Sequence, residues 1–233
     1  PEQITFDQLN SQYGPCAVVP ILMYHHIQDG VVAAKGNYQS LNVDPGVFRA
    51  QMEYIKNNYT AITFSQLAAF FDNGTALPAK PIIITFDDGY VDLYVNALPI
   101  MRDLGLHATV FTITGLNNNP AYLTWDQISE MAGSGLFAFG NHTWSHHNLI
   151  ASEAIISTEI DTAQNQLIEK GLNNEKIFAY PYGAYSNLTI KHLQTQGYSE
   201  AVTTHYGTIQ CKSHRLTLSR IRIGNGALSA YGL

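Results

Sequence analysis

The stretch Pro81–Tyr90, which reads P-I-I-I-T-F-D-D-G-Y, constrains the fold more than any other part of the chain. It begins with a short, continuous apolar run, which is typical of a strand buried on both faces in a parallel sheet. The run ends at two adjacent carboxylates, Asp87 and Asp88, and then at Gly89, which permits a sharp turn. Charge at the end of a buried strand must be paired or bound, and ligands of α/β proteins bind at that end. The stretch therefore predicts a functional strand end, with an ordinary Asp-Asp-Gly surface turn as the alternative.

Strand and helix patterns alternate through the 233 residues, with no linker rich in Pro, Gly or Ser and no internal repeat. This alternation predicts one α/β domain, 18–233, and a barrel-like sheet suits the number of strands. Residues 1–17 are expected to form an N-terminal arm, and residues 28–43 a polar loop.

The expected elements follow from apolar periodicity and from capping residues. The expected strands are 18–24 (with an irregularity near Pro20), 61–64, 81–86, 108–112, 136–140, 176–179, 200–203 and 218–223. The expected helices are one that begins at Asp44-Pro45, one capped by Ser65 that runs to about 73, then 90–104 (ending at Gly105), 124–131, 152–170 (ending at Gly171) and 186–196.

Composition narrows the range of partners. Hydrophobic residues make up 45% of the chain and charged residues only 13%, which argues against disorder. A formal charge of −6 and a pI near 5.8 argue against nucleic acid as a partner. The 14 tyrosines favour carbohydrate, which needs apolar faces together with hydrogen-bonding groups. No apolar run approaches membrane-spanning length.

The two cysteines, Cys16 and Cys211, are far apart in the sequence and form no C-x-x-C motif. They could be one disulfide that ties the N-terminal segment to the C-terminal part of the domain, or two free thiols. The chain begins at Pro1 without Met and carries no signal peptide. We therefore expect a trimmed protein that is secreted or on the cell surface. The even cysteine count then favours the disulfide.

Histidines follow the strand expected at 136–140, where the chain reads N-H-T-W-S-H-H over 141–147. If this turn is helical, His142 and His146 share a face and could chelate one ion. Histidines are also ordinary core or surface residues. Two imidazoles and one carboxylate from the aspartate pair would match a catalytic Zn²⁺ or a related divalent ion.

Two further strand ends carry candidate residues. The run F-A-Y-P-Y-G at 178–183 follows an expected strand, although a Pro-Tyr-Gly turn needs no function. His25 and His26 follow the first expected strand. A histidine there could be a proton donor, a metal ligand or an incidental neighbour.

These motifs resemble those of the polysaccharide deacetylases with the NodB-homology domain, which form carbohydrate esterase family four. The resemblance covers about 18–225, and its subgroup features are similar to those of poly-N-acetylglucosamine deacetylases. The matching motifs are P-I-L-M-Y-H-H-I at 20–27, T-F-D-D-G at 85–89, H-T-W-S-H at 142–146 and, in part, A-Y-P-Y-G at 179–183.

The resemblance implies a distorted (β/α) barrel with about seven parallel strands. It also implies a divalent metal, most often zinc, with cobalt or nickel as alternatives. Carried over position by position, the metal ligands are Asp88, His142 and His146.

The resemblance further implies that Asp87 is the general base, that His25 is the general acid and that the backbone N–H of Tyr182 binds the oxyanion. Amide hydrolysis needs these parts. A metal polarises the carbonyl and activates water, a base accepts the proton of the water, and an acid protonates the leaving amine. Preorganised donors stabilise the tetrahedral oxyanion.

The chain departs from the family pattern in two places. Many relatives carry arginine two residues before the proline of the third motif, where it orients the catalytic aspartate, but here that residue is Ala179. Arg215, Arg220 or Arg222 could replace it in space. Many relatives also take the acid histidine from a C-terminal Leu-x-x-His motif, whereas 218–221 reads L-S-R-I. That absence favours His25. The rival histidines are His26, His147, His205 and His214.

The function expected from these features is metal-dependent hydrolysis of N-acetyl groups on N-acetylglucosamine polymers or oligomers, namely poly-N-acetylglucosamine, chitin oligomers or peptidoglycan. One alternative is an O-acetyl esterase that acts on xylan, because the motifs do not separate esters from amides. Another is a carbohydrate-binding domain with a degenerate site, which Ala179 suggests. We expect the protein to be a monomer.

Overall fold

The apolar run that ends at Asp87 is strand β6 (Pro81–Phe86), and it is buried from its second residue onward. In the computed structural model, which describes residues 4–36 and 38–233, β6 belongs to a parallel barrel. Within the described residues seven strands close this barrel, because β2 pairs with both β6 and β12. Around the ring they are β2 (Ile21–Tyr24), β12 (Leu218–Arg222), β10 (Glu200–Tyr206), β9 (Ile177–Ala179), β8 (Phe137–Asn141), β7 (Ala108–Thr112) and β6.

The barrel is irregular in two places. Strands β8 and β9 pair only at Asn141 and Phe178. The register of β10 against β12 shifts between Val202 and Tyr206. A short eighth strand, β5 (Thr60–Ala61), pairs with the start of β6. The prediction of a distorted parallel barrel is confirmed.

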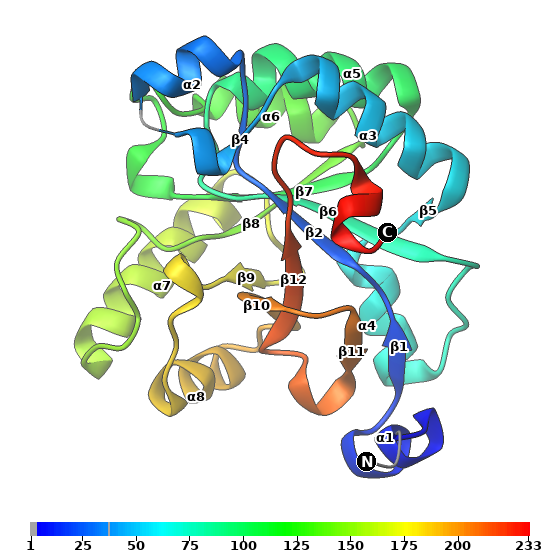
Figure 1. The fold of residues 1–233 in the computed structure, drawn as a ribbon. Helices are drawn as coiled ribbons and strands as arrows, with labels where there is room; N and C mark the ends of the chain where they lie inside the picture. Colours follow the sequence, from blue (N-terminus) through cyan, green and yellow to red (C-terminus); the bar gives the residue numbers. More distant parts are fainter. Residues whose placement is uncertain (1–3, 37) are drawn as a thin grey trace.

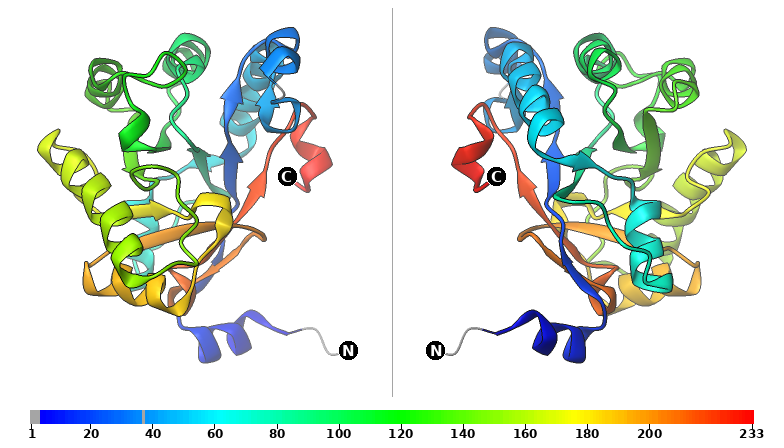
Figure 2. Two further views of the ribbon diagram at one scale, coloured as in Figure 1. Left: turned by 90° about the vertical axis from the view of Figure 1, so that its left-hand side faces the viewer. Right: turned by 90° about the vertical axis from the view of Figure 1, so that its right-hand side faces the viewer.

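Helices cover the outside of the barrel, as Figures 1 and 2 show. Several begin at hydroxyl caps whose side chains accept a backbone N–H, which satisfies one of the free donors of the first turn. The helices are α3 (Pro45–Asn58), α4 (Phe64–Asn73), α5 (Leu98–Leu104), α6 (Trp125–Gly133), α7 (Glu153–Glu169) and α8 (Asn187–Thr195). The cap of α4 is Thr63 rather than the predicted Ser65, because Thr63 forms a capping box with Gln66.

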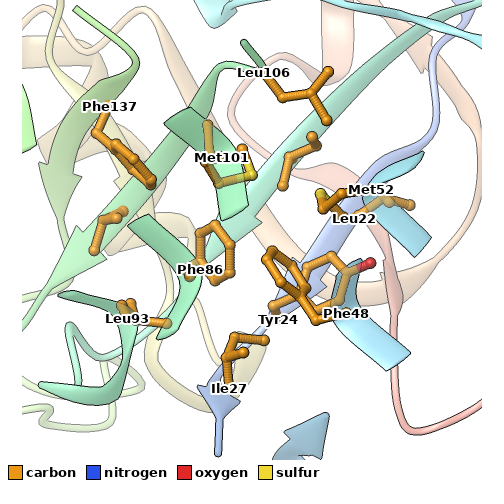
Figure 3. Close-up of a cluster of buried hydrophobic side chains, with 14 of the residues drawn as sticks. Leu22, Tyr24, Ile27, Phe48, Met52, Phe86, Leu93, Met101, Leu106 and Phe137 are labelled. Carbon is orange, nitrogen blue, oxygen red and sulfur yellow. The ribbon is translucent and has the colours of Figure 1, made fainter. Parts of the chain in front are cut away.

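Alternation along the strands gives the barrel two apolar layers. One face of β2 and β6 packs outward against α3 and α5, where Tyr24, Phe48 and Phe86 form an aromatic contact that Figure 3 shows. The other face, with Ile21 and Ile83, packs in a second cluster that includes side chains of α4. Since side chains alternate in a strand, Thr85 and Asp87 continue the face of Ile83.

Three predicted segments differ from the structure. The N-terminal arm contains helix α1 (Phe6–Tyr13), which begins at a capping box of Thr5 and Gln8 and buries no residue. The predicted loop 28–43 contains α2 (Gly30–Gly36), a 3₁₀ turn (Gln39–Leu41) and β4 (Asn42–Val43), which pairs with β3 (His26–Ile27). The predicted helix 90–104 begins as a π-helical turn (Leu93–Ala97) before α5, although it does end at Gly105.

The irregularity predicted at Pro20 is confirmed, because the first strand is split around it. The part before it, β1 (Cys16–Val18), leaves the barrel and pairs antiparallel with β11 (Ile209–Cys211). Cys16 and Cys211 form the predicted disulfide in this pair. Among the described residues, no helix is long and apolar enough to span a membrane.

Candidate active site

The predicted site residues follow the carboxyl ends of neighbouring strands. Asp87 and Asp88 follow β6, His142 follows β8, Tyr182 follows β9, and His25 lies between β2 and β3. Parallel strands bring these ends to one edge of the barrel. The turn after β6 depends on glycine: Gly89 has φ +74°, and a Cβ there would lie 2.6 Å from Thr112 Oγ1.

Asp88, His142 and His146 converge on one point, and their ligand atoms all lie within 4.8 Å of one another. Asp88 Oδ1 is 3.3 Å from His142 Nε2 and 3.4 Å from His146 Nε2. His142 Nδ1 lies 2.8 Å from the carbonyl oxygen of Ala179, so Nδ1 carries the proton and donates it. Nε2 is therefore the ring nitrogen that faces the carboxylate, as in a metal ligand oriented by its outer hydrogen bond.

The donor set fits a divalent metal. Asp88 Oδ1 is buried and has no hydrogen-bond partner among the described residues. Burial acts to raise the pKa of Asp88, but the neighbouring histidines lower it, so the carboxyl is ionised. Burial and His142 lower the pKa of His146 to about 4, which favours the neutral imidazole that binds metal. Two imidazoles and a carboxylate leave coordination positions open.

The predicted reason for this convergence is wrong. Residues 142–146 are not helical, and Thr143 and His146 have left-handed φ values of 67° and 62°. The hydroxyl of Thr143 accepts the N–H of His146 at 2.9 Å, which closes the loop on itself. A tight irregular loop, rather than a helical face, brings the two imidazoles together.

Asp87 is held by Arg220, the one of the three arginines considered in the sequence that reaches it. Arg220 Nη1 and Nη2 donate to the two carboxylate oxygens at 2.7 and 2.6 Å, and both side chains are almost fully buried. Arg220 also donates to the Thr203 carbonyl and the Thr85 hydroxyl. Burial acts to raise the pKa of Asp87, but Arg220 holds it below its usual value. Asp87 is therefore a fixed, ionised carboxylate beside the Asp88 site.

Comparison with known proteins decides the family. The model of the family described as polysaccharide deacetylase matches residues 74–201, which is more than half of the chain. The chain belongs to the polysaccharide deacetylase family. The family predicted from the motifs is confirmed.

The deacetylase is similar to several known proteins. It is 31% identical to YxkH of Bacillus subtilis (strain 168) over 219 residues, 93% of this chain and 75% of that protein. It is 24% identical to the poly-β-1,6-N-acetyl-D-glucosamine N-deacetylase of Staphylococcus epidermidis, over 88% of this chain and 79% of that protein. Among solved structures, the Streptococcus pyogenes deacetylase PplD in complex with acetate aligns with a TM-score of 0.80 and 32% identity, covering 88% of this chain and 92% of that one.

His25 of the deacetylase lies within electrostatic range of both aspartates. Burial lowers its pKa, although Asp87 and Asp88 act to raise it.

The rival histidines have other surroundings. The Nδ1 of His26 donates to Asp92 at 2.6 Å, and the His26 ring stacks on Tyr90 at 3.6 Å. His214 lies against Tyr13 of the N-terminal helix α1, and His205 lies 6.0 Å from Tyr185. His147 is exposed on the loop after His146.

Tyr182 lies in a tight turn after β9, with φ 60° and ψ 6°. Its side chain is 66% exposed, and its ring lies 4.6 Å from that of His146. The next residue must be glycine, because a Cβ on Gly183 would lie 2.1 Å from Thr204 Oγ1. This turn brings both the backbone and the ring of Tyr182 to the rim of the site.

An aromatic group beside Asp88 was not predicted. Tyr90 stacks between His26 and Tyr122, and Tyr38 lies 4.5 Å from the His26 ring. Burial, with the charge of Asp88, raises the pKa of Tyr90 far above its usual value, so its hydroxyl keeps its proton. The only signal in the sequence was the tyrosine directly after Asp-Asp-Gly, because Tyr38 and Tyr122 come from loops distant in sequence.

Proposed function

We propose that this deacetylase is metal-dependent and removes N-acetyl groups from N-acetylglucosamine-containing polysaccharides or oligosaccharides. The proposal rests on one observation: the neighbouring carboxylates of Asp87 and Asp88 have different partners. Asp88 Oδ1 faces two histidine nitrogens and has no hydrogen-bond partner among the described residues, whereas Asp87 is fixed by Arg220. One carboxylate is thus suited to bind a metal and the other to accept a proton.

Asp88, His142 and His146 would hold the metal, with zinc the expected ion and cobalt or nickel as alternatives. When bound, such an ion supplies a Lewis acid and lowers the pKa of water. Asp87 accepts a proton from the attacking water, and Arg220 keeps it ionised and oriented for this step.

The acid and the oxyanion donor come from other strand ends. His25 donates a proton to the leaving amine, from the end of β2. The backbone N–H of Tyr182 donates to the carbonyl oxygen as negative charge develops on it. Each group does one task that amide hydrolysis requires.

Two observations support an N-acetylglucosamine substrate. The Staphylococcus epidermidis relative is named as a deacetylase of poly-β-1,6-N-acetyl-D-glucosamine. Tyr38, which is 38% exposed, and Tyr122 pack beside Tyr90 near Asp88, and aromatic side chains suit sugar rings. The alternative of a degenerate, sugar-binding domain loses its main support, because Arg220 pairs with Asp87 although position 179 is alanine.

The disulfide supports a secreted or cell-surface location, and we expect the enzyme to act as a monomer.

A panel of acetate-release assays tests the proposal. Purified protein loaded with zinc would be incubated with β-1,6-linked N-acetylglucosamine oligomers, chitin oligomers, peptidoglycan and acetylated xylan. We expect acetate from a glucosamine substrate, loss of release with a chelator, and recovery with added zinc. Release from xylan alone would show an O-acetyl esterase, and no release from any substrate would reject the enzyme proposal.

A further inference from the structure

The loop that carries His142 and His146 cannot be held by its own backbone. Two of its residues, Thr143 and His146, adopt left-handed φ values that side chains with a Cβ rarely adopt. Such residues persist only where the surroundings fix them. The question is therefore which part of the molecule imposes this conformation.

Helix α7 holds the loop at three points. The carboxylate of Glu159 accepts the N–H of Ser145 at 2.8 Å and its hydroxyl at 2.6 Å. The carbonyl of Glu159 accepts the N–H of Trp144 at 3.0 Å. The next carbonyl, that of Ile160, accepts the Asn141 side-chain amide at 2.9 Å, and Asn141 in turn accepts the N–H of Thr143 at 2.8 Å.

Glu159 is an unusual residue for this position. It is only 6% exposed, yet it makes no ion pair among the described residues, and its two carboxylate oxygens accept only from Ser145 there. The buried face of α7 is otherwise largely apolar, with Ile156, Ile160 and Ala163. Burial of a carboxylate without a cation is costly. A role in geometry, rather than in packing, explains why the charge lies here.

We propose that Glu159 is a positioning residue that sets the spacing of His142 and His146 for the metal. The proposal rests on the proposed function only in that these histidines bind a divalent ion. Ser145 directly precedes His146, so a shift of its N–H and hydroxyl moves the second imidazole. Partners that orient metal ligands change metal affinity by about 10- to 100-fold when they are replaced.

The test is zinc affinity of the folded, metal-free protein, measured by competition with a chromophoric chelator. We expect Glu159→Gln to weaken zinc binding by about 10- to 100-fold, because the amide has one acceptor oxygen for the two donors of Ser145. The control is Glu169→Gln, an exposed charge on the same helix, which should leave affinity unchanged. Ser145→Ala should weaken binding less, because it keeps the backbone bond, and the double variant should lose less than the sum of the two.

Thermal unfolding of the metal-free variants separates positioning from stability. Unchanged zinc affinity in Glu159→Gln, at a temperature where circular dichroism shows it folded, would overturn the proposal. If Glu159→Gln does not fold, Ser145→Ala decides, and unchanged affinity there would overturn it too. Zinc binding by the unaltered protein without acetate release would reject only the proposed function, whereas no zinc binding would reject both.

Discussion

Each end of the barrel contains an arginine beside a buried carboxylate, but the two arginines differ in how many carboxylates they bind. At the carboxyl end both Nη groups of Arg220 donate to Asp87, the one carboxylate among the described residues with which Arg220 forms an ion pair. At the amino end of β10, Arg215 is shared between Asp72 and Glu200, and one oxygen of Glu200 is buried with no hydrogen-bond partner among the described residues.

The pKa directions of the two carboxyl groups follow this difference. Burial acts to raise the pKa of both groups. Arg220, which pairs with one carboxylate, lowers the pKa of Asp87, whereas the effect of burial is larger at Glu200 and its pKa is raised. An arginine that pairs with one buried carboxylate keeps that carboxylate fixed and ionised. An arginine that serves two, at 23% side-chain exposure, forms a structural network.

The largest expected effect is a loss of stability when Arg220, which pairs with one carboxylate, is replaced. Arg220→Met leaves Asp87 buried and unpaired, and we expect the free energy of unfolding to fall by about 3–5 kcal/mol. Arg215→Met should cost less, because Glu200 can take up a proton and Asp72 is partly exposed. Urea unfolding at neutral pH measures both, and equal losses would show that the two ends do not differ.

Activity should separate the two carboxylates next. Asp87→Asn is expected to lower kcat by at least ~100-fold, because it removes a positioned base. Zinc content, measured by atomic absorption, should be retained, whereas Asp88→Asn or His142→Ala should lose it. Glu200→Gln is the matched change at the other end and should leave kcat near normal. Normal turnover in Asp87→Asn would assign the base elsewhere.

The histidines allow the same contrast. His25→Ala should also lower kcat by at least ~100-fold with zinc retained, because the leaving amine loses its acid. His214→Ala, beside the N-terminal helix α1, is the control and should have no effect on turnover. If His25→Ala turns over a natural substrate normally, another group donates the proton, and His26 is the next to test.

The smallest expected effect is the pH dependence of stability, and its sign differs between the two ends. Asp87 has a lower pKa in the folded state than in the unfolded state, where it is about 3.9. It therefore stabilises the folded protein at pH values above about 3.9, and this stabilisation is lost as the pH falls through the folded-state pKa. Glu200 has a higher pKa in the folded state than in the unfolded state, where it is about 4.3. It therefore stabilises the folded protein at pH values below about 4.3, and this stabilisation is lost as the pH rises through the folded-state pKa.

Unfolding free energies from pH 3 to 8 would measure this difference. The stability of the unaltered protein relative to Asp87→Asn should grow with rising pH, and that relative to Glu200→Gln should shrink. Changes of the same sign would contradict the contrast between the two arginines.

Much of the barrel could be predicted because its signals are local. The apolar run of β6, the Asp44-Pro45 helix start and the glycine after α5 each depend on neighbouring residues, and all three are found in the structure. Helix α1 was missed because the signal at its start, a capping box of Thr5 and Gln8, was not recognised. The proposed metal ligands were grouped by motif and spacing, and the structure does bring them together.

What could not be predicted depends on distant parts of the chain. The choice of Arg220 among three arginines follows from closure of the barrel, which brings β12 to the same ring as β6. The left-handed conformations of Thr143 and His146 belong to a loop whose hydrogen-bond partners are distant in sequence, among them Gly115 and Glu159. No pattern within 141–147 carries that information, so a helical turn was the natural but wrong interpretation.

The closure of the ring by its first strand also sets the order of folding. Strand β2 lies between β6 and β12. Both of its edges are therefore paired only after β12, the last strand that the structure describes, has formed. Pairings between such distant segments form slowly, because the intervening chain loses entropy first. Until Leu218–Arg222 is made, β2 and β10 keep open edges, and the nascent protein is exposed to misassembly through them. The pair of Asp87 and Arg220 also forms only with that strand, so the base of the proposed reaction depends on closure of the barrel.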